Sequence, residues 1–332
     1  GLSLSPTGNT SRTPSAAYTH DLVADRSLQY IGQHAADSNP FYMQVNYTIP
    51  HFDLDAISSF GLGEYAGRPW SDKQKKYAAM ITRMDASIGD LLAKLQDPNG
   101  DGDVSDSIME QTLVVFTSDN GPTPEDGSPI SFFNASGPYR GGKRDLYEGG
   151  IRMPTVAMWP GTIPAGQQTD RATDIADWLP TVAELAGTAG PVGMDGVSIS
   201  PLLTGHGIQH ERKYLIYEHH EGDGPDPDGR NGRWAIIRGS DKLIKFANGD
   251  FELFDLAADP SEASPVDLSV PAHAALKDEL QAIALAEGVE RPDSYAVENP
   301  VWVGVDGGQI SNPANWNGGA IPAENGATVL RN

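Results

Sequence analysis

Residues 112 to 154 read TLVVFTSDNGPTPEDGSPISFFNASGPYRGGKRDLYEGGIRMP, and this stretch predicts the fold of the chain. It opens with Thr112–Thr117, an apolar, β-branched run that is typical of a buried strand in a parallel sheet. Asp119 and Asn120 follow that strand directly. Ligands bind beyond the carboxyl ends of strands in open α/β sheets, so the stretch predicts an α/β fold with a site at this edge.

The residues after the strand predict a site for a metal ion and an anion. Asp119 and Asn120 offer a carboxylate and an amide carbonyl, hard oxygen ligands that suit Ca²⁺ or Mg²⁺. Further along, the segment Gly141-Gly142-Lys143 places a cation on flexible backbone. Each motif alone is more common as turn chemistry or as a solvated surface lysine, so the prediction depends on their order along the chain.

The whole stretch closely resembles the later part of a type I sulfatase, of the arylsulfatase kind, in the alkaline phosphatase superfamily. The motifs TSDNG, GGK and YEGGIRMP carry this resemblance. It implies that Asp119 and Asn120 ligate the active-site cation and that Lys143 contacts the sulfate group. It also implies the fold class: a mixed, mostly parallel sheet sandwiched by helices, followed by a smaller C-terminal antiparallel sheet with a helix.

His51 completes the set of predicted site residues. It follows the segment Phe41–Tyr47, which is predicted as a strand, and the short sequence Thr-Ile-Pro. A loop histidine without a role is the more common interpretation of such a residue taken alone. Its position just past a strand end predicts that it lies on the same sheet edge as Asp119. The resemblance implies that His51 hydrogen-bonds the sulfate, and it could also protonate the leaving alcohol.

The sequence predicts two domains and a tail. Residues 1–208 form the later part of the catalytic α/β domain, 209–287 a C-terminal subdomain, and 288–332 a linker with the start of a Gly/Asn-rich β-repeat module or a plain tail. Apolar periodicity and turn signals predict the following elements. They are helices over 18–36, 72–95 (N-cap Ser71), 171–187 (kinked or restarted at Pro180) and 273–286, and strands over 154–158, 214–218, 233–238, 242–246 and 251–254.

An acidic segment after the second predicted helix matches the start of an EF-hand calcium loop. Asp97, Asn99 and Asp101 stand at the first three liganding positions, and Gly102 stands where that loop turns sharply. The twelfth position is Ile108, which cannot supply the bidentate carboxylate. A second, structural calcium site therefore competes with a simpler interpretation, a solvated acidic turn.

Composition excludes several classes of function. The chain of 332 residues has 23 Lys and Arg against 45 Asp and Glu, a net charge of −22, which disfavours nucleic acid as a partner. The same charge would repel a sulfated polymer unless the site is locally basic. No apolar run is long enough to span a membrane. The lack of cysteine excludes disulfides, thiolate metal sites and a cysteine nucleophile within the chain.

The family nucleophile is a formylglycine made from Cys or Ser in a Cys/Ser-x-Pro-x-Arg motif. The segments Ser38-Asn39-Pro40 and Ser311-Asn312-Pro313 contain Ser-x-Pro, but neither continues to the arginine. The resemblance covers roughly residues 18–285. We therefore expect the formylglycine to lie upstream of this chain, and we expect the chain alone to be inactive.

The expected function is part of a metal-assisted sulfuric ester hydrolase, acting on a sulfated glycan or a small aryl sulfate. The expected location is the periplasm or the outside of a bacterial cell. Two alternatives stay open. One is a phosphodiesterase or phosphonate hydrolase of the same superfamily, which a Thr or Ser nucleophile without the Pro-x-Arg context would favour. The other is a secreted binding protein without catalytic activity.

Overall fold

The computed structural model describes residues 18–51, 54–124, 129–220 and 232–289. The chain forms two compact units, one spanning Thr13–Lys213 and the other mainly from Tyr214 onward. The predicted tail lies outside the described residues from position 290 on. No helix in the described part is long and apolar enough to cross a membrane.

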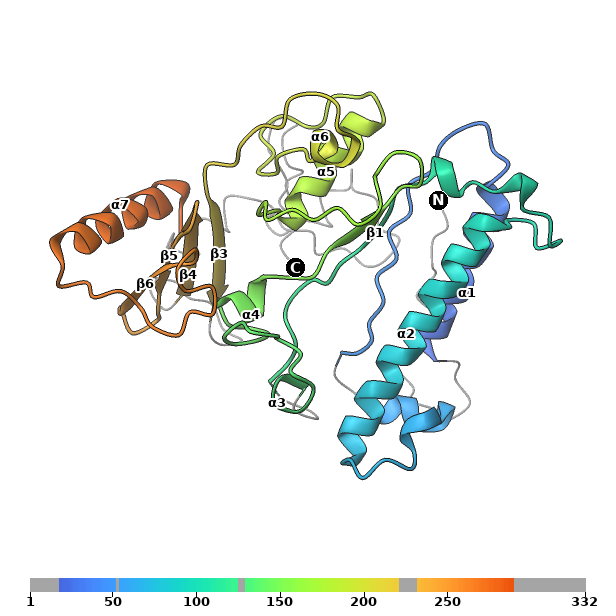
Figure 1. The fold of residues 1–332 in the computed structure, drawn as a ribbon, viewed down its shortest axis with the longest axis horizontal. Coiled ribbons are helices and arrows are strands. Elements are labelled where there is room, and N and C mark those ends of the chain that lie inside the picture. The colour runs from blue at the N-terminus through green and yellow to red at the C-terminus, as the bar shows by residue number, and fades with distance from the viewer. Residues whose placement is uncertain (1–17, 52–53, 125–128, 221–231, 290–332) are drawn as a thin grey trace, which may run out of the picture. The chain divides into compact units, whose positions relative to one another are not determined.

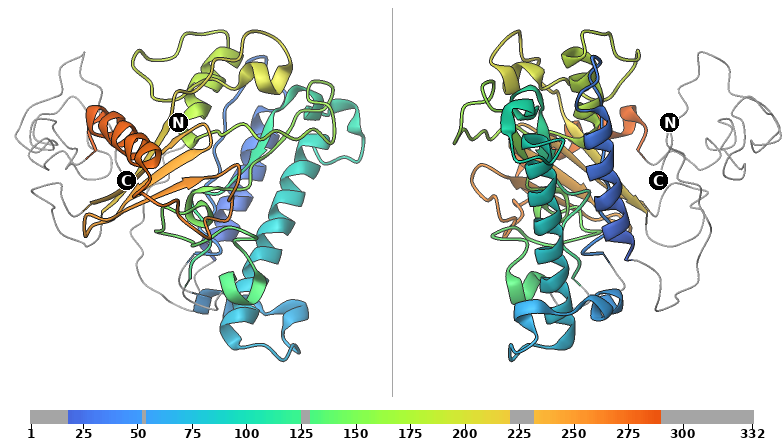
Figure 2. Two further views of the ribbon diagram at one scale, coloured as in Figure 1. Left: turned by 60° about the vertical axis from the view of Figure 1, so that its left-hand side comes forward. Right: turned by 90° about the vertical axis from the view of Figure 1, so that its right-hand side faces the viewer.

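Two long helices lie side by side in the first unit (Figure 2). They are α1 (Thr19–His34) and α2 (Asp72–Gln96), close to the predicted ranges. The Ser71 hydroxyl accepts a hydrogen bond from the Gln74 amide at 3.3 Å, and the Gln74 side chain accepts one from the Ser71 amide at 2.9 Å. This reciprocal capping box confirms the predicted N-cap.

His20 is buried between the two helices. It is 1 % exposed, and its Nε2 lies 2.9 Å from the Ser87 hydroxyl while its Nδ1 has no partner. Burial lowers the pKa of His20 below its ordinary value of 6.5. The charge of Asp21 and the Arg83 backbone oppose this effect, and the charge of Arg83 adds to it. The folded protein therefore resists protonation of this ring.

We expect the free energy of unfolding to fall as the pH drops below the ordinary histidine pKa of 6.5. In that range the unfolded chain binds a proton that folded His20 refuses, and this difference disappears only below the lowered pKa of the folded state. His20→Gln should flatten this part of the pH profile, measured by urea denaturation between about pH 8 and pH 5. An unchanged slope in the variant would assign the acid sensitivity to other groups.

The segment Phe41–Tyr47, predicted as a strand, forms no ladder with another strand in the described part of the chain. Its side chains still alternate between half-buried and exposed. On the exposed side, Gln44 hydrogen-bonds Tyr42 at 3.3 Å and Asn46 at 3.0 Å. This period of two is typical of a strand. The segment is therefore extended as predicted, and what differs from the prediction is that it pairs with no described strand. The local pattern indicates an extended segment, but it cannot provide a neighbouring strand.

Strands β1 (Val114–Phe116) and β2 (Val156–Met158) lie within the predicted segments and pair with each other antiparallel. No parallel pair occurs among the strands that the structure describes. β1 is half-buried, and Phe116 at its end is 39 % exposed, so β1 is less buried than predicted. In its described residues, the loop between the strands contains the short helices α3 (Pro129–Phe133) and α4 (Glu148–Ile151) and no longer helix. A parallel pair usually needs a longer crossover helix.

The predicted helix around Pro180 is a new helix rather than a kinked one. A 3-10 turn over Ile175–Asp177 leads into α5 (Trp178–Leu185). Pro180 lies in the first turn of α5, where backbone N–H groups have no acceptor within the helix, so the missing N–H of proline costs no hydrogen bond. The buried Asp177 accepts a hydrogen bond from the Val197 amide at 2.7 Å and also pairs with Arg212. These contacts fix the chain that leads through α6 (Ser200–Thr204) to the end of the unit.

The second unit is a four-stranded antiparallel sheet with a helix on one face (Figure 1). The strands, in spatial order, are β3 (Leu215–His220), β4 (Gly232–Arg238), β5 (Asp241–Lys245) and β6 (Phe251–Asp255). Leu280 and Ala284 of α7 (Pro271–Glu287) pack against Trp234, Leu243 and Leu253. This confirms the predicted sheet and helix.

Candidate functional site

Backbone hydrogen bonds join the three motifs of residues 112–154, TSDNG, GGK and YEGGIRMP, to one another. The Gly121 amide donates to the Gly150 carbonyl at 2.9 Å. The Lys143 amide donates to the Pro122 carbonyl at 2.8 Å. Pro122, which accepts this hydrogen bond, is only two positions beyond Asn120. The backbone of Lys143 therefore lies close to the Asp-Asn pair, and the roles of these side chains stay predictions.

Glycines make this close approach possible. A Cβ at Gly121 would overlap the Gly149 carbonyl oxygen and come within 2.9 Å of the Gly150 Cα. A Cβ at Gly142 would overlap the Ile130 Cδ1 atom and lie 2.5 Å from the Pro122 carbonyl oxygen. Backbone atoms, and at Gly142 also the Ile130 side chain, fill these spaces, so no side chain can enter without separating the motifs.

We expect Gly121→Ala to lower the free energy of unfolding by about 3 kcal/mol or more, because the added methyl forces packed backbone apart. Gly67→Ala is the matched control, since a Cβ there meets nothing within 4 Å. It should change stability by less than about 0.5 kcal/mol. Urea denaturation measures both, and equal midpoints for the two variants would contradict the close approach.

Asp119 and Asn120 have oxygen atoms available for a cation. The Asp119 side chain is exposed and forms no hydrogen bond or ion pair within the described part of the chain. The Asn120 amide nitrogen donates to the Gly121 carbonyl at 3.1 Å, which leaves its Oδ1 as an acceptor. These two oxygens fit a hard divalent cation, and Ca²⁺ takes about six to eight such ligands in all. Nowhere in the described part do three or more His, Asp or Glu side chains gather as a metal site.

Lys143 is half-buried, and its ammonium forms no ion pair in the described part of the chain. The turn around it is rich in cations. The Arg140 guanidinium lies 3.9 Å from the centre of the Tyr147 ring. Arg144 adopts a φ of 77°, a left-handed conformation that is uncommon outside glycine. Such strained backbone is often found at functional turns, and the cations make this turn suitable for binding an anion.

His51 is exposed and follows a turn in which its amide donates to the Thr48 carbonyl at 2.9 Å. Its ring forms no hydrogen bond or ion pair within the described residues. The strand expected before it lacks a ladder partner there, so the common sheet edge that would align His51 with Asp119 is not seen. The convergence of His51 with Lys143 stays a prediction.

The acidic segment at Asp97, Asn99 and Asp101 forms a tight series of turns. Asp97 accepts hydrogen bonds from the Gly100 and Gly102 amides at 2.7 and 2.9 Å. Asn99 accepts one from the Asp101 amide at 2.8 Å. The carboxylate and amide oxygens here thus cap backbone N–H groups. Calcium binding by this segment stays a prediction.

The sequence analysis assigned no role to a group of aromatic residues near this site. Trp70, Phe132 and Phe133 come from two different loops, and the structure brings their rings within 6 Å of one another. The available signal was the presence of large aromatic residues in otherwise polar or Gly- and Pro-rich loops. That signal does not identify contact partners, because the two loops are distant in sequence.

Comparison with known families gives two matches. The model of the Sulfatase family matches residues 4–188, and the model described as N-sulphoglucosamine sulphohydrolase, C-terminal, matches residues 140–286. Human arylsulfatase A is 34% identical over 247 residues, which cover 74% of this chain and 42% of that protein. A sulfatase of Formosa agariphila is 31% identical over 267 residues, covering 74% of this chain and 45% of that protein. The chain thus spans less than half the length of these relatives.

Solved structures show the fold. The crystal structure of Ps i-CgsB in complex with k-i-k-neocarrahexaose superposes with a TM-score of 0.67 at 24% identity, covering 85% of this chain and 58% of that one. The putative sulfatase yidJ from Bacteroides fragilis gives 0.57 at 19% identity, covering 80% of this chain and 58% of that one. These matches confirm the predicted alkaline phosphatase-like α/β fold class.

Proposed function

This chain belongs to the sulfatase family, and we propose that it forms the part of a sulfuric ester hydrolase site that binds the cation and the sulfate group. The observation that carries this proposal is the hydrogen-bonded unit that holds Gly121 against Gly150 and Lys143 against Pro122. Within it, Asp119 and Asn120 would hold Ca²⁺ or Mg²⁺, and Lys143 would bind a sulfate oxygen through a charge-assisted hydrogen bond. His51 would bind a second oxygen and donate a proton to the leaving alcohol.

The bound cation would stabilise the negative charge of the reacting sulfate. The nucleophile is the part that these residues do not provide. No cysteine occurs in the chain, and neither Ser-x-Pro segment continues to an arginine. We propose that a formylglycine on polypeptide outside these 332 residues supplies it, so the chain alone would release no sulfate. We also propose a periplasmic or extracellular location, supported by the resemblance of the tail to secreted bacterial repeat modules.

The test combines calcium binding with sulfate release. In the full-length enzyme, Asp119→Ala should lose sulfate release from an aryl sulfate and from a sulfated oligosaccharide, because the cation loses a charged ligand. Calorimetric titration of the same variant with Ca²⁺, repeated with Mg²⁺, should show one class of site missing.

Asp101→Ala is the control, because it removes a carboxylate of the other acidic segment. It should leave sulfate release unchanged. The proposal fails if Asp119→Ala still releases sulfate at the parent rate, or if the parent enzyme hydrolyses a phosphonate ester and no sulfate ester.

A further inference from the structure

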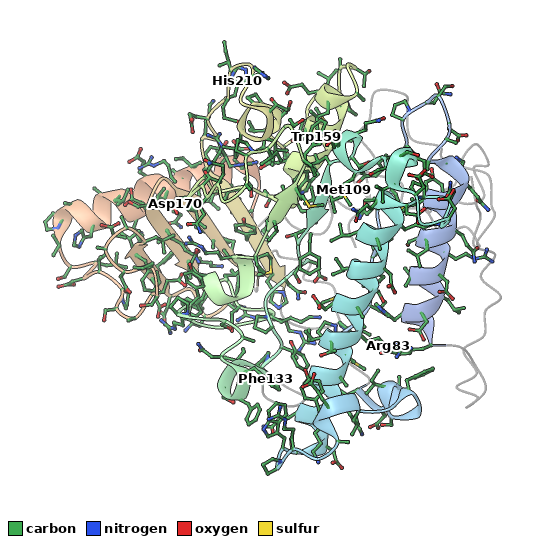
Figure 3. The ribbon with its side chains drawn as sticks, turned by 45° about the vertical axis from the view of Figure 1, so that its right-hand side comes forward. Arg83, Met109, Phe133, Trp159, Asp170 and His210 are labelled. Carbon is green, nitrogen blue, oxygen red and sulfur yellow. The ribbon has the colours of Figure 1, made fainter. Side chains whose placement is uncertain are left out.

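A cluster of aromatic rings joins α3 to the start of α2. The Trp70 ring centre lies 5.2 Å from that of Phe132 and 5.6 Å from that of Phe133, both edge-on. Tyr65 stacks on Trp70 at 5.7 Å, and Tyr77 stacks on Phe133 at 5.7 Å. In Figure 3, Phe133 on α3 lies beside the amino-terminal end of α2. We call these five residues the aromatic cluster.

The aromatic cluster is open to solvent on one side. Phe132 is 42 % exposed, and Trp70 and Tyr65 are only half-buried. Tyr65 and Tyr77 pack against the buried core of the first unit, which holds the cluster in place. Rigid rings that are anchored on one side and exposed on the other are typical of ligand-binding surfaces.

Basic residues are concentrated in the segment that carries Trp70 and in the turn that adjoins α3. The segments 68–76 and 140–152 together contain eight basic and three acidic residues, in a chain of net charge −22. Arg68 is exposed, and its guanidinium carbon lies 5.7 Å from the Trp70 ring centre. Its acidic neighbour is Glu64, whose carboxylate lies 3.9 Å away, too far for a hydrogen bond. Two of these cations are paired with acids, Lys76 with Asp55 and Arg152 with Glu148, but the two segments still carry a net positive charge, which favours polyanions there.

The aromatic cluster adjoins the turn that carries Lys143. The Ile130 Cδ1 atom on α3 fills the space beside Gly142, the residue before Lys143. Phe133 follows Ile130 by one helical turn, about 5 Å along the axis. A sugar next to the one whose sulfate reaches Lys143 would therefore meet these rings.

We propose that Trp70, Phe132 and Arg68 form a subsite for a negatively charged sugar adjoining the sugar whose sulfate ester is cleaved. This inference rests on the proposed function and names its substrate class, a sulfated oligosaccharide rather than a small aryl ester. The exposed rings pack against the apolar face of the sugar, and the Arg68 guanidinium pairs with its sulfate or carboxylate. The subsite supplies binding energy at a distance from the reacting sulfur.

The experiment uses Phe132→Ala and Arg68→Gln, with Arg26→Gln on α1 as the matched charge control. The probes are a heparin-derived and a carrageenan-derived hexasaccharide, each also in chemically desulfated form. By calorimetry on the 332-residue chain, each subsite variant should weaken binding of the sulfated probe about tenfold, which corresponds to about 1.4 kcal/mol. Arg68→Gln should not change binding of the desulfated carrageenan probe, which carries no charge, and should still weaken binding of the desulfated heparin probe, which keeps its carboxylates. Arg26→Gln should change the binding of no probe.

Hydrolysis by the full-length enzyme gives the second readout. Both subsite variants should raise KM for the sulfated hexasaccharide that is cleaved, while kcat and KM for a small aryl sulfate stay at the parent values. An equal loss on the aryl sulfate would make the cluster a purely structural element and overturn the subsite. Parent-like binding by the variants, or no binding of either probe by the parent chain, would overturn it as well. If the probes bind in an Arg68-dependent way but no sulfate ester is cleaved, the subsite stands and the proposed hydrolase function fails.

Discussion

Replacing Glu262 with glutamine is expected to lower the free energy of unfolding by about 3–5 kcal/mol. Glu262 and Lys242 are both fully buried, and the Lys242 Nζ lies 2.7 Å from the Glu262 Oε1. Lys242 projects from the face of β5 opposite to α7, beside Phe254 of β6. The glutamine keeps the shape but removes the negative charge that faces the buried ammonium. Denaturation in urea, with β3–β6 followed by circular dichroism, measures the loss.

Two further variants separate burial from ion pairing. Lys242→Met combined with Glu262→Gln should be more stable than Glu262→Gln alone, because the buried ammonium that has lost the Glu262 charge is gone. Glu279→Gln breaks the Arg238–Glu279 pair, whose side chains are 31% and 60% exposed, and should cost far less than Glu262→Gln. Equal losses for the exposed and the buried pair would show that burial does not set the strength of the interaction.

This ion pair also shows where sequence reasoning stops. The strands of the second unit could be predicted because each is short, rich in apolar residues and bounded by Gly or Asp turns. Lys242 lies within one of them, and a strand lysine is normally taken to face solvent. Its burial depends on Glu262, a residue in a later loop, and no local pattern specifies that partner.

The same limit applies in the first unit. The apolar periodicity that predicts a helix over 72–95 and the Ser71 cap are local signals, and the structure confirms the helix and its cap. The pattern of Phe41–Tyr47 is local too, and its alternation is observed, but pairing requires another segment of chain. The direction of the β1 pairing likewise depends on which strand returns beside it.

At the site, the order of the motifs predicts a shared site, and the backbone of the Lys143 turn lies close to the Asp-Asn pair. The sequence did not reveal why so many glycines occur there. Gly121 and Gly142 are required because carbonyl groups and Ile130 occupy the space of their missing side chains, which only coordinates can show. The aromatic cluster escaped prediction for a related reason, since Trp70 and Phe132 meet only after both loops have folded.

In the full-length enzyme, Lys143→Ala is expected to lower the turnover of sulfate esters about 100- to 1,000-fold, or about 2.7–4 kcal/mol. This prediction rests on the proposed function. The half-buried ammonium has no ion-pair partner in the described part of the chain, so its charge is available to the substrate. Negative charge on the sulfate oxygens grows as the ester bond breaks, and a nearby cation then stabilises the transition state more than the ground state. The loss should therefore appear mainly in kcat, with a smaller change in KM.

Lys213→Ala is the control for a general charge effect, because it removes an equal charge from an exposed lysine and should leave kcat unchanged. Lys143→Arg keeps the charge on a planar, bulkier group, so it should recover only part of the lost turnover. A rise in KM at unchanged kcat would mean that Lys143 binds substrate and transition state equally, and the role proposed for it in the reaction would be wrong. The hydrogen bond from the Lys143 amide to the Pro122 carbonyl and the tight packing of Gly142 hold the backbone of this turn in place. If Lys143→Ala lowers kcat and leaves the unfolding midpoint unchanged, the effect is therefore due to loss of the ammonium.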